Sequence, residues 1–399
     1  MPRPYIPYKI KTIEPITLLS REEREKKITI VGNNVFKLKS EYIYIDFLTD
    51  SGTGAMSAEQ LSRAIVGDES YAGSRSYFRL EKVIQDIIGL PFVMPVHQGR
   101  AAEQVLNFLL INKGDAVPGN SHFDTTKAHI EIRGGRAIDC TIDEGRESGL
   151  EHPFKGNLDI KKLQSAFEKY GKEKIPYVLV TITCNSGGGQ PVSMKNIKEV
   201  SSFCKENNLR LFFDAARFAE NAYFIQQRED GYKNKLVKEI VKEMFSYVDG
   251  CTMSAKKDGL VPIGGFLAFR DQELYDQLQP YEILFEGYST YGGMSGMDME
   301  AMAQGLTEVI EDDYLAYRIG QTQYLGDRLA KKKISIVKPV GGHAVFIDGR
   351  KFFPNIPENQ FPAQLLVIEL YKEGGIRAVE IGLTISIIFG SGKVMRLQH

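Results

Sequence analysis

The chain has 399 residues, of which 43% are hydrophobic and 25% are charged, so neither a disordered protein nor a membrane protein is expected. This length predicts two or three domains of about 100–200 residues each. The 50 Lys and Arg residues against 51 Asp and Glu leave a net charge of -1, which argues against a nucleic-acid binder that relies on phosphate neutralisation. The N-terminus lacks the apolar core of a secretory signal, and no apolar stretch approaches a membrane span. We therefore expect a cytoplasmic protein.

The cysteines exclude two kinds of stabilising site. Cys140, Cys184, Cys204 and Cys251 are widely separated, with no Cys-x-x-Cys pair and no histidine at ligand spacing. We expect four buried thiols rather than a disulfide scaffold or a structural zinc site.

The first predicted elements lie before residue 90. Tyr42–Leu48 is rich in β-branched and aromatic residues and predicts a strand. Ser57 followed by Gln60 matches a helix-capping box. Arg79–Ile88 carries an apolar stripe at helical spacing, and Gly89 is expected to end that helix.

Strand and helix patterns alternate further along the chain. Phe92–Val96, Tyr177–Thr183 and Leu209–Phe213 predict buried strands, while Ile197–Phe203 has helical spacing. This alternation predicts an α/β protein with a mainly parallel sheet. Ligands of such sheets bind beyond the carboxyl ends of the strands, so the chemistry is expected there.

The pattern changes after Glu311. Tyr314–Lys331 predicts a long helix, and a smaller α+β unit is expected to follow it. We predict three parts: an N-terminal arm that includes part of the small domain (1–56), a large domain (57–311) and a small C-terminal domain (312–399).

Two polar segments follow predicted strands. Gln98, Gly99 and Arg100 stand at a strand-to-helix turn, where a helix N-terminus and a guanidinium can hold an anion. An ordinary turn with an exposed arginine would have the same sequence. Asn185 precedes three consecutive glycines, which indicates either a tight loop or a close approach to a ligand.

Charged and aromatic residues complete the candidate set. Asp214 directly follows an apolar strand, and its carboxylate needs either Arg217 or a cationic ligand nitrogen as partner. Lys256 and Lys257 could belong to a solvated turn, but their apolar, glycine-rich flanks favour a lysine that forms a Schiff base. Phe123 could cover a planar ligand. A phosphate anchor, a stacking ring, a carboxylate and a reactive lysine are what pyridoxal phosphate requires, and their order suits the aminotransferase-like fold (fold type I).

Long motifs also resemble a known family. The chain resembles the β-eliminating lyases of aromatic amino acids from about Pro7 to Gly382. The matching motifs are LTDSGTGAM (48–56), GDESYAGSRSY (67–77), PVHQGRAAEQ (95–104), GGQPVS (188–193), DAARFAENAYFI (214–225), SAKKD (254–258), GGHAVF (341–346) and FPAQ (361–364).

The resemblance implies a role for each cofactor-site residue. Lys257 matches the lysine that binds the cofactor covalently, and Asp214 matches the carboxylate that faces the ring nitrogen. Asn185 and Arg217 match residues near the ring's phenolic oxygen, and Phe123 matches the stacking ring. The residues that match the phosphate cup are Gln98, Gly99, Arg100 and Ser254, with Lys256 beside them.

The resemblance further implies how the substrate is bound and cleaved. Tyr71 matches the general acid for the leaving group and is expected to come from a neighbouring chain. Thr49, Ser51, Asn185 and Ile381 are the expected substrate contacts. Motifs such as GIRAVEIG (375–382) look more like the tryptophanase branch of the family. Ile381 stands where tyrosine phenol-lyases carry an arginine that contacts the phenol oxygen, and Asp124 supplies an acidic group near the indole leaving group. The expected reaction is conversion of L-tryptophan to indole, pyruvate and ammonium, and the alternative is tyrosine phenol-lyase activity.

A monovalent cation and a homo-oligomer are implied as well. Gly52, Glu69 and Pro262 match a site for potassium or ammonium, and a tetramer built from two dimers is expected. After Gly382 the sequence departs from the family, and Arg396 is a poor match for the arginine that grips the substrate carboxylate. From this departure we expect a truncated product that binds pyridoxal phosphate but eliminates indole poorly, or has little catalytic activity.

Overall fold

The computed structural model describes residues 6–381 and is built around a seven-stranded sheet. In spatial order its strands are β2 (Phe92–Val96), β8 (Gly265–Phe269), β7 (Gly250–Ser254), β6 (Leu211–Asp214), β5 (Val178–Thr181), β3 (Ala116–Gly119) and β4 (Arg136–Asp139). Within this sheet β8 runs antiparallel to both of its neighbours, and the remaining pairs are parallel. The carboxyl ends of the other six strands therefore share one edge.

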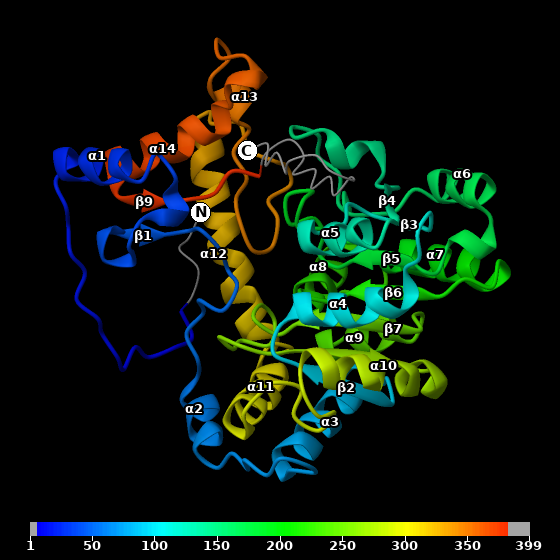
Figure 1. Cartoon of the computed structure of the whole chain (residues 1–399). Helices are drawn as coiled ribbons and strands as arrows, with labels where there is room; N and C mark the ends of the chain where they lie inside the picture. The colour runs from blue at the N-terminus through cyan, green and yellow to red at the C-terminus, as the bar shows by residue number, and fades with distance from the viewer. Residues whose placement is uncertain (1–5, 382–399) are drawn as a thin grey trace.

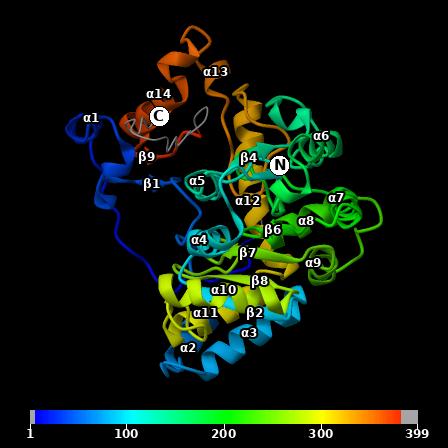
Figure 2. The same ribbon diagram turned by 45° about the vertical axis from the view of Figure 1, so that its right-hand side comes forward.

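The central strands are buried on both faces, which explains why they lack polar alternation. Val178 and Val180 of β5 belong to one hydrophobic core, whereas Leu179 belongs to the core on the opposite face. Helices cover both faces of the sheet (Figure 1 and Figure 2). At about 1.5–3 kcal/mol for each fully buried large apolar side chain, these two cores stabilise the sheet and fix its register.

The helices alternate with the strands over most of the chain. Their bounds are α1 (Arg21–Ile30), α2 (Ala58–Ile65), α3 (Arg75–Ile88), α4 (Gly99–Leu110), α5 (Asp124–Ile132), α6 (Ile160–Tyr170), α7 (Met194–Glu206), α8 (Phe218–Arg228), α9 (Val237–Phe245), α10 (Gln272–Phe285), α11 (Gly296–Glu308), α12 (Asp312–Lys331), α13 (Gly349–Phe352) and α14 (Pro362–Gly374). The core on one face takes side chains from α3, α7, α9 and α11, and the core on the other takes them from α4, α5 and α10.

The N-terminal and C-terminal segments pack against each other, away from the large sheet (Figure 1). Strand β1 (Ile45–Asp46) pairs in parallel with β9 (Ile376–Arg377), and α1 lies against α14. Ile28 and Tyr371 are fully buried in the small core between them. We propose from these contacts that the N-terminal segment folds with the C-terminal one, with the domain boundary near residue 311.

Local sequence signals located several element ends correctly. Ser57 and Gln60 form the predicted capping box at the start of α2. Helix α3 ends at Gly89, whose φ of 72° is readily adopted by glycine. The strand predicted for Tyr42–Leu48 is wrong in length, because β9 offers only two residues for pairing and only Ile45–Asp46 form a ladder. All four cysteines are buried and free, as predicted.

Between residues 6 and 381, no helix combines the length and the apolar character needed to cross a membrane.

Candidate active site

Polar side chains from neighbouring strands gather at the carboxyl edge of the sheet. Asp214 is the last residue of β6 and pairs in register with Thr181 of β5 and Thr252 of β7. Ser254 ends β7, and Asn185 follows β5 in the chain. This edge is where a mainly parallel α/β sheet binds its ligands.

The start of α4 forms a close-fitting anion cradle beside Ser254. Gln98 is the extended N-cap residue of α4, and Gly99 is its first helical residue. A Cβ atom at Gly99 would lie 2.5 Å from the Cβ of Ser254, so only glycine allows this approach. Unpaired N–H groups at a helix N-terminus attract phosphate, and Arg100 is exposed directly beside them. The three predicted anchor residues and Ser254 are therefore adjacent.

Lys257 carries an amine suited to nucleophilic chemistry. Its Nζ donates a hydrogen bond of 2.8 Å to Ser254 Oγ. Burial lowers the pKa of Lys257 to about 8, and the nearby Arg217 guanidinium contributes to the shift. A substantial fraction of the amine is therefore neutral near pH 8, and the neutral form is the nucleophile.

Asp214 is buried with few partners of its own. It is 8% exposed, and its Oδ1 accepts one hydrogen bond of 3.3 Å from the Ala216 backbone. Burial raises its pKa, although Lys257 and Arg217 act in the opposite direction. Such a carboxylate gains from a cationic N–H partner, which a protonated pyridine ring supplies.

Glu103 is a second buried acid near Asp214 that sequence reasoning missed. Its Oε1 accepts a 2.7 Å hydrogen bond from Thr126, and its Oε2 has no partner among the described residues. Burial raises the pKa of Glu103 to about 7, and Asp214 adds to the shift. A glutamate within a regular helix gives no sequence signal of this location.

Arg217 finds a different partner from the one considered in the sequence. It stands at the N-cap of α8, and its Nε and Nη2 donate to both carboxylate oxygens of Asp50 at 2.9 and 2.8 Å. Arg318 of α12 also donates to Asp50 at 3.2 Å. Burial would raise the pKa of Asp50, but Arg217, His343 and Arg318 together hold it far below its usual value. Arg217 therefore pairs with Asp50 of the N-terminal segment, and not with Asp214 as the simpler reading of the sequence suggested.

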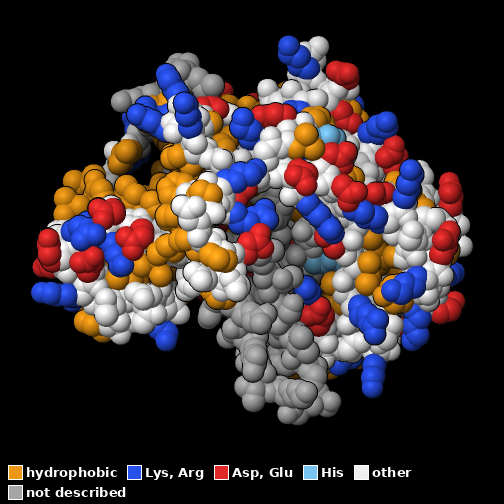
Figure 3. All heavy atoms as spheres, turned by 90° about the horizontal axis from the view of Figure 1, so that it is seen from above, with side chains coloured by type: hydrophobic (Ala, Val, Ile, Leu, Met, Phe, Trp, Pro, Cys, Tyr) orange, Lys and Arg blue, Asp and Glu red, His pale blue; other side chains and the backbone are white. Residues whose placement is uncertain are grey.

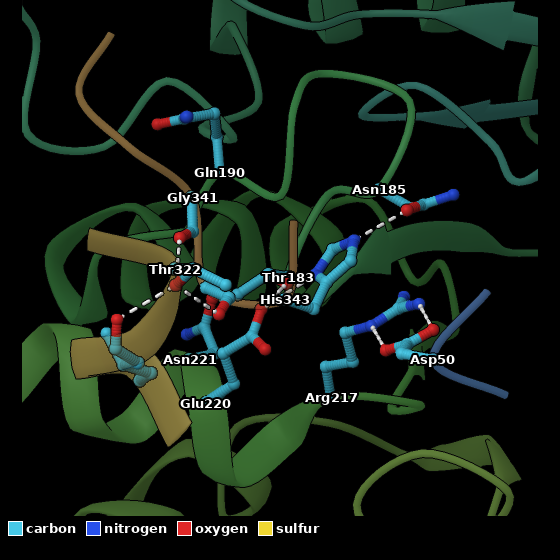
Figure 4. A network of polar contacts seen from close by, with 12 residues as sticks. Asp50, Thr183, Asn185, Gln190, Arg217, Glu220, Asn221, Thr322, Gly341 and His343 are labelled. Atoms are coloured by element: carbon cyan, nitrogen blue, oxygen red, sulfur yellow. Dashed lines mark hydrogen bonds and ion pairs between the residues drawn. The ribbon is translucent and has the colours of Figure 1, made fainter. Parts of the chain in front are cut away.

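Asn185 belongs to a polar chain that runs through His343 to Glu220 (Figure 4). His343 Nε2 lies 2.7 Å from Asn185 Oδ1, and His343 Nδ1 lies 3.0 Å from Glu220 Oε1. Neither His343 nor Glu220 was singled out as a site residue from sequence. The histidine inside the GGHAVF motif was the available signal.

The N-terminal loop lies against the lysine turn. The backbone N–H of Gly52 donates to the Lys256 carbonyl at 2.6 Å. A Cβ atom on Gly52, whose φ is 73°, would meet the Lys256 side chain at 2.8 Å and the Pro262 carbonyl oxygen at 3.0 Å. Thr49 and Ser51 flank Asp50 in this loop, and Ser51 N–H donates to Thr49 Oγ1 at 3.0 Å.

Two of the three residues predicted for the cation site lie close together. Gly52 and Pro262 are neighbours, but the Glu69 carboxylate accepts hydrogen bonds of 2.8 and 3.1 Å from the backbone N–H groups of Gly296 and Met297. Glu69 therefore caps the start of α11 within this chain. The described residues contain no cluster of three or more His, Cys, Asp or Glu side chains suited to a metal ion.

Several predicted residues make no contact with Lys257 in the structure. Tyr71 is 69% exposed and packs its ring against Tyr288 and Tyr291. Phe123 is the N-cap residue of α5 and Asp124 its first residue, beyond the carboxyl end of β3. Ile381 is 48% exposed at the end of the described chain. The segment that follows, from Gly382 through Arg396, lies outside the described residues.

The edge of the sheet fits the chemistry of pyridoxal phosphate. A glycine-lined helix N-terminus suits the phosphate, and Asp214 suits a protonated ring nitrogen. Lys257 supplies the amine that an aldehyde requires. Asp214 ends β6, Lys257 follows β7, and the N-terminus of α4 follows β2, so all three lie at the same edge of the sheet.

Comparisons with known proteins agree with this reading. The family model described as "Beta-eliminating lyase" matches residues 46–386. A tyrosine phenol-lyase of Symbiobacterium thermophilum is 52% identical over 384 residues, covering 96% of this chain and 84% of that protein. A tryptophanase of Salinibacter ruber is 51% identical over 384 residues, covering 96% of this chain and 81% of that protein.

Solved structures with low sequence identity share the fold. Aspartate aminotransferase from Thermotoga maritima has a TM-score of 0.59 at 12% identity, covering 90% of this chain and 88% of that one. An aminotransferase from Staphylococcus aureus has a TM-score of 0.58 at 16% identity, covering 84% of each chain. The predicted fold type I is thus confirmed. With its family model and two relatives above 50% identity, the chain belongs to the β-eliminating lyases, a pyridoxal phosphate-dependent family that acts on aromatic amino acids.

Proposed function

We propose that this protein binds pyridoxal phosphate through Lys257 and removes the aromatic side chain of an amino acid by β-elimination. The observation that carries the proposal is the partly buried Lys257 amine, whose pKa is lowered to about 8 at the carboxyl edge of the sheet. Asp214, on the adjacent strand end, would hold the N–H of the cofactor ring. The N-terminus of α4 and Ser254 would hold the phosphate.

The remaining cofactor contacts follow from the same arrangement. Arg100 and Gln98 would add side-chain donors to the phosphate cup, with Lys256 beside them. Phe123 would stack on the ring from the end of β3. Arg217 and Asn185 would approach the phenolic oxygen. In the structure, Nε and Nη2 of Arg217 are bonded to Asp50.

Proton transfers at defined atoms complete the reaction. When bound, pyridoxal phosphate supplies an electrophilic aldehyde and an electron-withdrawing ring that weaken the bonds of the substrate's α-carbon. Lys257 Nζ, in its neutral form, would take the α-proton. The hydroxyl of Tyr71 would donate a proton to the leaving aromatic carbon, since its hydrogen bond with Tyr291 raises its pKa and keeps it protonated.

L-Tryptophan is the substrate we propose first. The apolar Ile381 offers no donor to a phenol oxygen, and Asp124 supplies an acidic acceptor suited to an indole N–H. L-Tyrosine is the second candidate, because relatives from Symbiobacterium thermophilum and Pasteurella multocida carry the name tyrosine phenol-lyase. Identities of 52% and 51% to a tyrosine phenol-lyase and a tryptophanase do not separate the two substrates.

Pyruvate release from three substrates tests this proposal. The full chain would be given saturating pyridoxal phosphate and then L-tryptophan, L-tyrosine or an S-alkylcysteine in parallel. We expect pyruvate from all three and the highest kcat/KM with tryptophan among the two aromatic substrates. The chain contains no tryptophan, so loss of substrate fluorescence gives an independent reading.

Each result of this comparison has a distinct meaning. A higher kcat/KM with tyrosine than with tryptophan would show that L-tyrosine is the preferred substrate. If only the S-alkylcysteine gives pyruvate, the protein catalyses β-elimination but neither aromatic amino acid is its substrate. Bound cofactor without any pyruvate would identify a binding protein with little catalytic activity.

We also propose a homo-oligomer, a tetramer of two dimers, in which Tyr71 serves the site of a neighbouring copy. Hydrophobic side chains gather on the side where α1 and α14 lie (Figure 3). In the arm before α1, Ile10 and Ile13 are 83% and 92% exposed. Exposed apolar patches of this kind mark association surfaces. Light scattering is expected to give four times the 44.8 kDa chain mass, and a fully active monomer would contradict the proposal.

A monovalent cation, potassium or ammonium, is proposed near Gly52 and Pro262. The Pro262 carbonyl oxygen next to Gly52 is a hard ligand of the kind such ions prefer. Glu69 is proposed as the third contributor to this site.

A further inference from the structure

His343 lies between two polar side chains from distant parts of the chain, Asn185 in the turn after β5 and Glu220 of α8. Its ring nitrogens face Asn185 Oδ1 at 2.7 Å and Glu220 Oε1 at 3.0 Å (Figure 4). The His343 side chain is 4% exposed, and the Glu220 side chain is fully buried. Thr183 also donates a 2.6 Å hydrogen bond to Glu220 Oε1.

The hydrogen-bonding capacity of imidazole restricts this arrangement. An ionised Glu220 can only accept, so His343 Nδ1 must carry a proton. If Nε2 carries a proton as well, it donates to Asn185 Oδ1. If Nε2 is bare, it must accept from the Asn185 NH₂ group instead, and the amide must turn by half a rotation. The proton on His343 Nε2 therefore sets which end of Asn185 faces away from the histidine.

Charged groups of both signs surround Glu220 and His343. Burial would raise the pKa of Glu220, but His343, Arg318 and Arg217 hold it below its usual value. Asp50 is also close enough to interact with His343, and Asp258 Oδ2 accepts a hydrogen bond of 3.3 Å from the backbone N–H of Glu220. In the structure Oδ1 of Asn185 faces His343, and the amide nitrogen points away from it (Figure 4).

Close packing prevents the histidine from leaving this position. A Cβ on Gly342 would lie 2.1 Å from the carboxyl carbon of Glu220, and a Cβ on Gly189 would lie 3.0 Å from the His343 ring. Thr322 lies 3.0 Å from the Gly342 carbonyl oxygen and contacts this segment from α12. The ring is therefore fixed by its surroundings, and the small Asn185 amide is the group free to reverse.

We propose that Glu220 and His343 are positioning residues that orient the Asn185 amide, presenting its NH₂ group to the phenolic oxygen of the cofactor. This inference rests on the proposed function, because that function puts the cofactor beside Asn185. Loss of the His343 Nε2 proton reverses the amide and turns its carbonyl oxygen toward the cofactor. An oxygen facing an oxygen is repulsive, so the reversed amide weakens the contact.

Nuclear magnetic resonance of the full chain without cofactor tests the first half of the proposal. The six histidines would be labelled with ¹⁵N, and His343→Gln would assign the His343 signals. We expect the His343 signals to show a proton on each ring nitrogen, as the contacts to Glu220 Oε1 and Asn185 Oδ1 require, and Glu220→Gln to change them. A ring with one bare nitrogen, or identical His343 signals with and without Glu220, would overturn the proposal.

Cofactor absorbance as a function of pH tests the second half. With pyridoxal phosphate bound, we expect the pH of the cofactor's spectral transition to differ between Glu220→Gln and the unmodified chain, because the Asn185 amide is no longer held in place. His343→Gln removes the ring that contacts Asn185 Oδ1 and should shift the transition in the same direction. Thr322→Val disturbs the same segment without touching Glu220, His343 or Asn185, so it should keep the transition of the unmodified chain.

The variants distinguish positioning from a structural role. If Thr322→Val shifts the spectrum as Glu220→Gln does, the effect is structural and the proposal fails. If Glu220→Gln does not fold, His343→Gln and Thr322→Val still decide the result. If the unmodified chain does not bind the cofactor, the proposed function fails, while the histidine spectra still support or overturn the pairing of Glu220 with His343.

Discussion

Replacement of Lys257 by alanine should remove covalent cofactor binding and lower the rate of pyruvate release by at least about 10³-fold. Two contributions are lost together, the nucleophilic amine and the base for the α-proton, and a base alone is typically worth about 10²–10⁴ in rate. The partly buried Lys257 amine, whose pKa is lowered to about 8, is the group that we propose for both tasks. The rate would be measured at saturating pyridoxal phosphate and substrate, with cofactor absorbance recorded on the same samples.

Lys256→Ala is the matched comparison for this variant. Lys256 is adjacent in sequence and its side chain lies against Gly52, whereas Lys257 Nζ donates to Ser254 Oγ. We expect this variant to keep the covalent cofactor while binding it more weakly, because a cation next to the phosphate cup is lost. A Lys257→Ala protein that still forms the covalent absorbance band would reject Lys257 as the attachment site.

Replacement of Asp214 by asparagine should lower kcat by about 10²–10³-fold, the range typical of losing one preorganised electrostatic contact to the reacting system. Asparagine keeps the shape of the side chain but cannot hold a proton on the ring nitrogen by charge. The fold should survive. Burial raises the pKa of Asp214, so without cofactor the ionised carboxylate lowers the free energy of unfolding. This loss of stability develops as the pH rises through the raised pKa.

Thermal unfolding without cofactor separates these two effects. At neutral pH the Tm of Asp214→Asn is expected to equal or exceed that of the unmodified chain, since a buried charge has been removed. Below the ordinary pKa of an aspartate the two Tm values should converge. Full activity with an unchanged cofactor spectrum would show that another group holds the ring nitrogen.

Much of this arrangement could be predicted because its signals are local. The capping box at Ser57 and the glycine stop at Gly89 depend on neighbouring residues, so short sequence patterns are sufficient. Asp214 at a strand end and Gly99 at a helix start follow from the parallel sheet, which brings such ends to one edge. The family motifs added the chemical role of each residue.

The contacts that sequence reasoning missed are those between distant segments. Asp50 reaches Arg217 across 167 positions, and a local pattern offered only Asp214 as its partner. His343 meets Asn185 across 158 positions, through a glycine pair packed against Glu220. The short β1 has the same origin, because its length is set by a partner near the other end of the chain.

The most direct test of the account is to locate the cofactor on the chain. The protein would be incubated with pyridoxal phosphate, reduced with borohydride, digested and mapped by mass spectrometry. A pyridoxyl group on Lys257, with labelling that increases as the pH rises through about 8, is the predicted result. A label on Lys256 or on another lysine, or no label at all, would contradict the central claim that Lys257 is the reactive amine of this site.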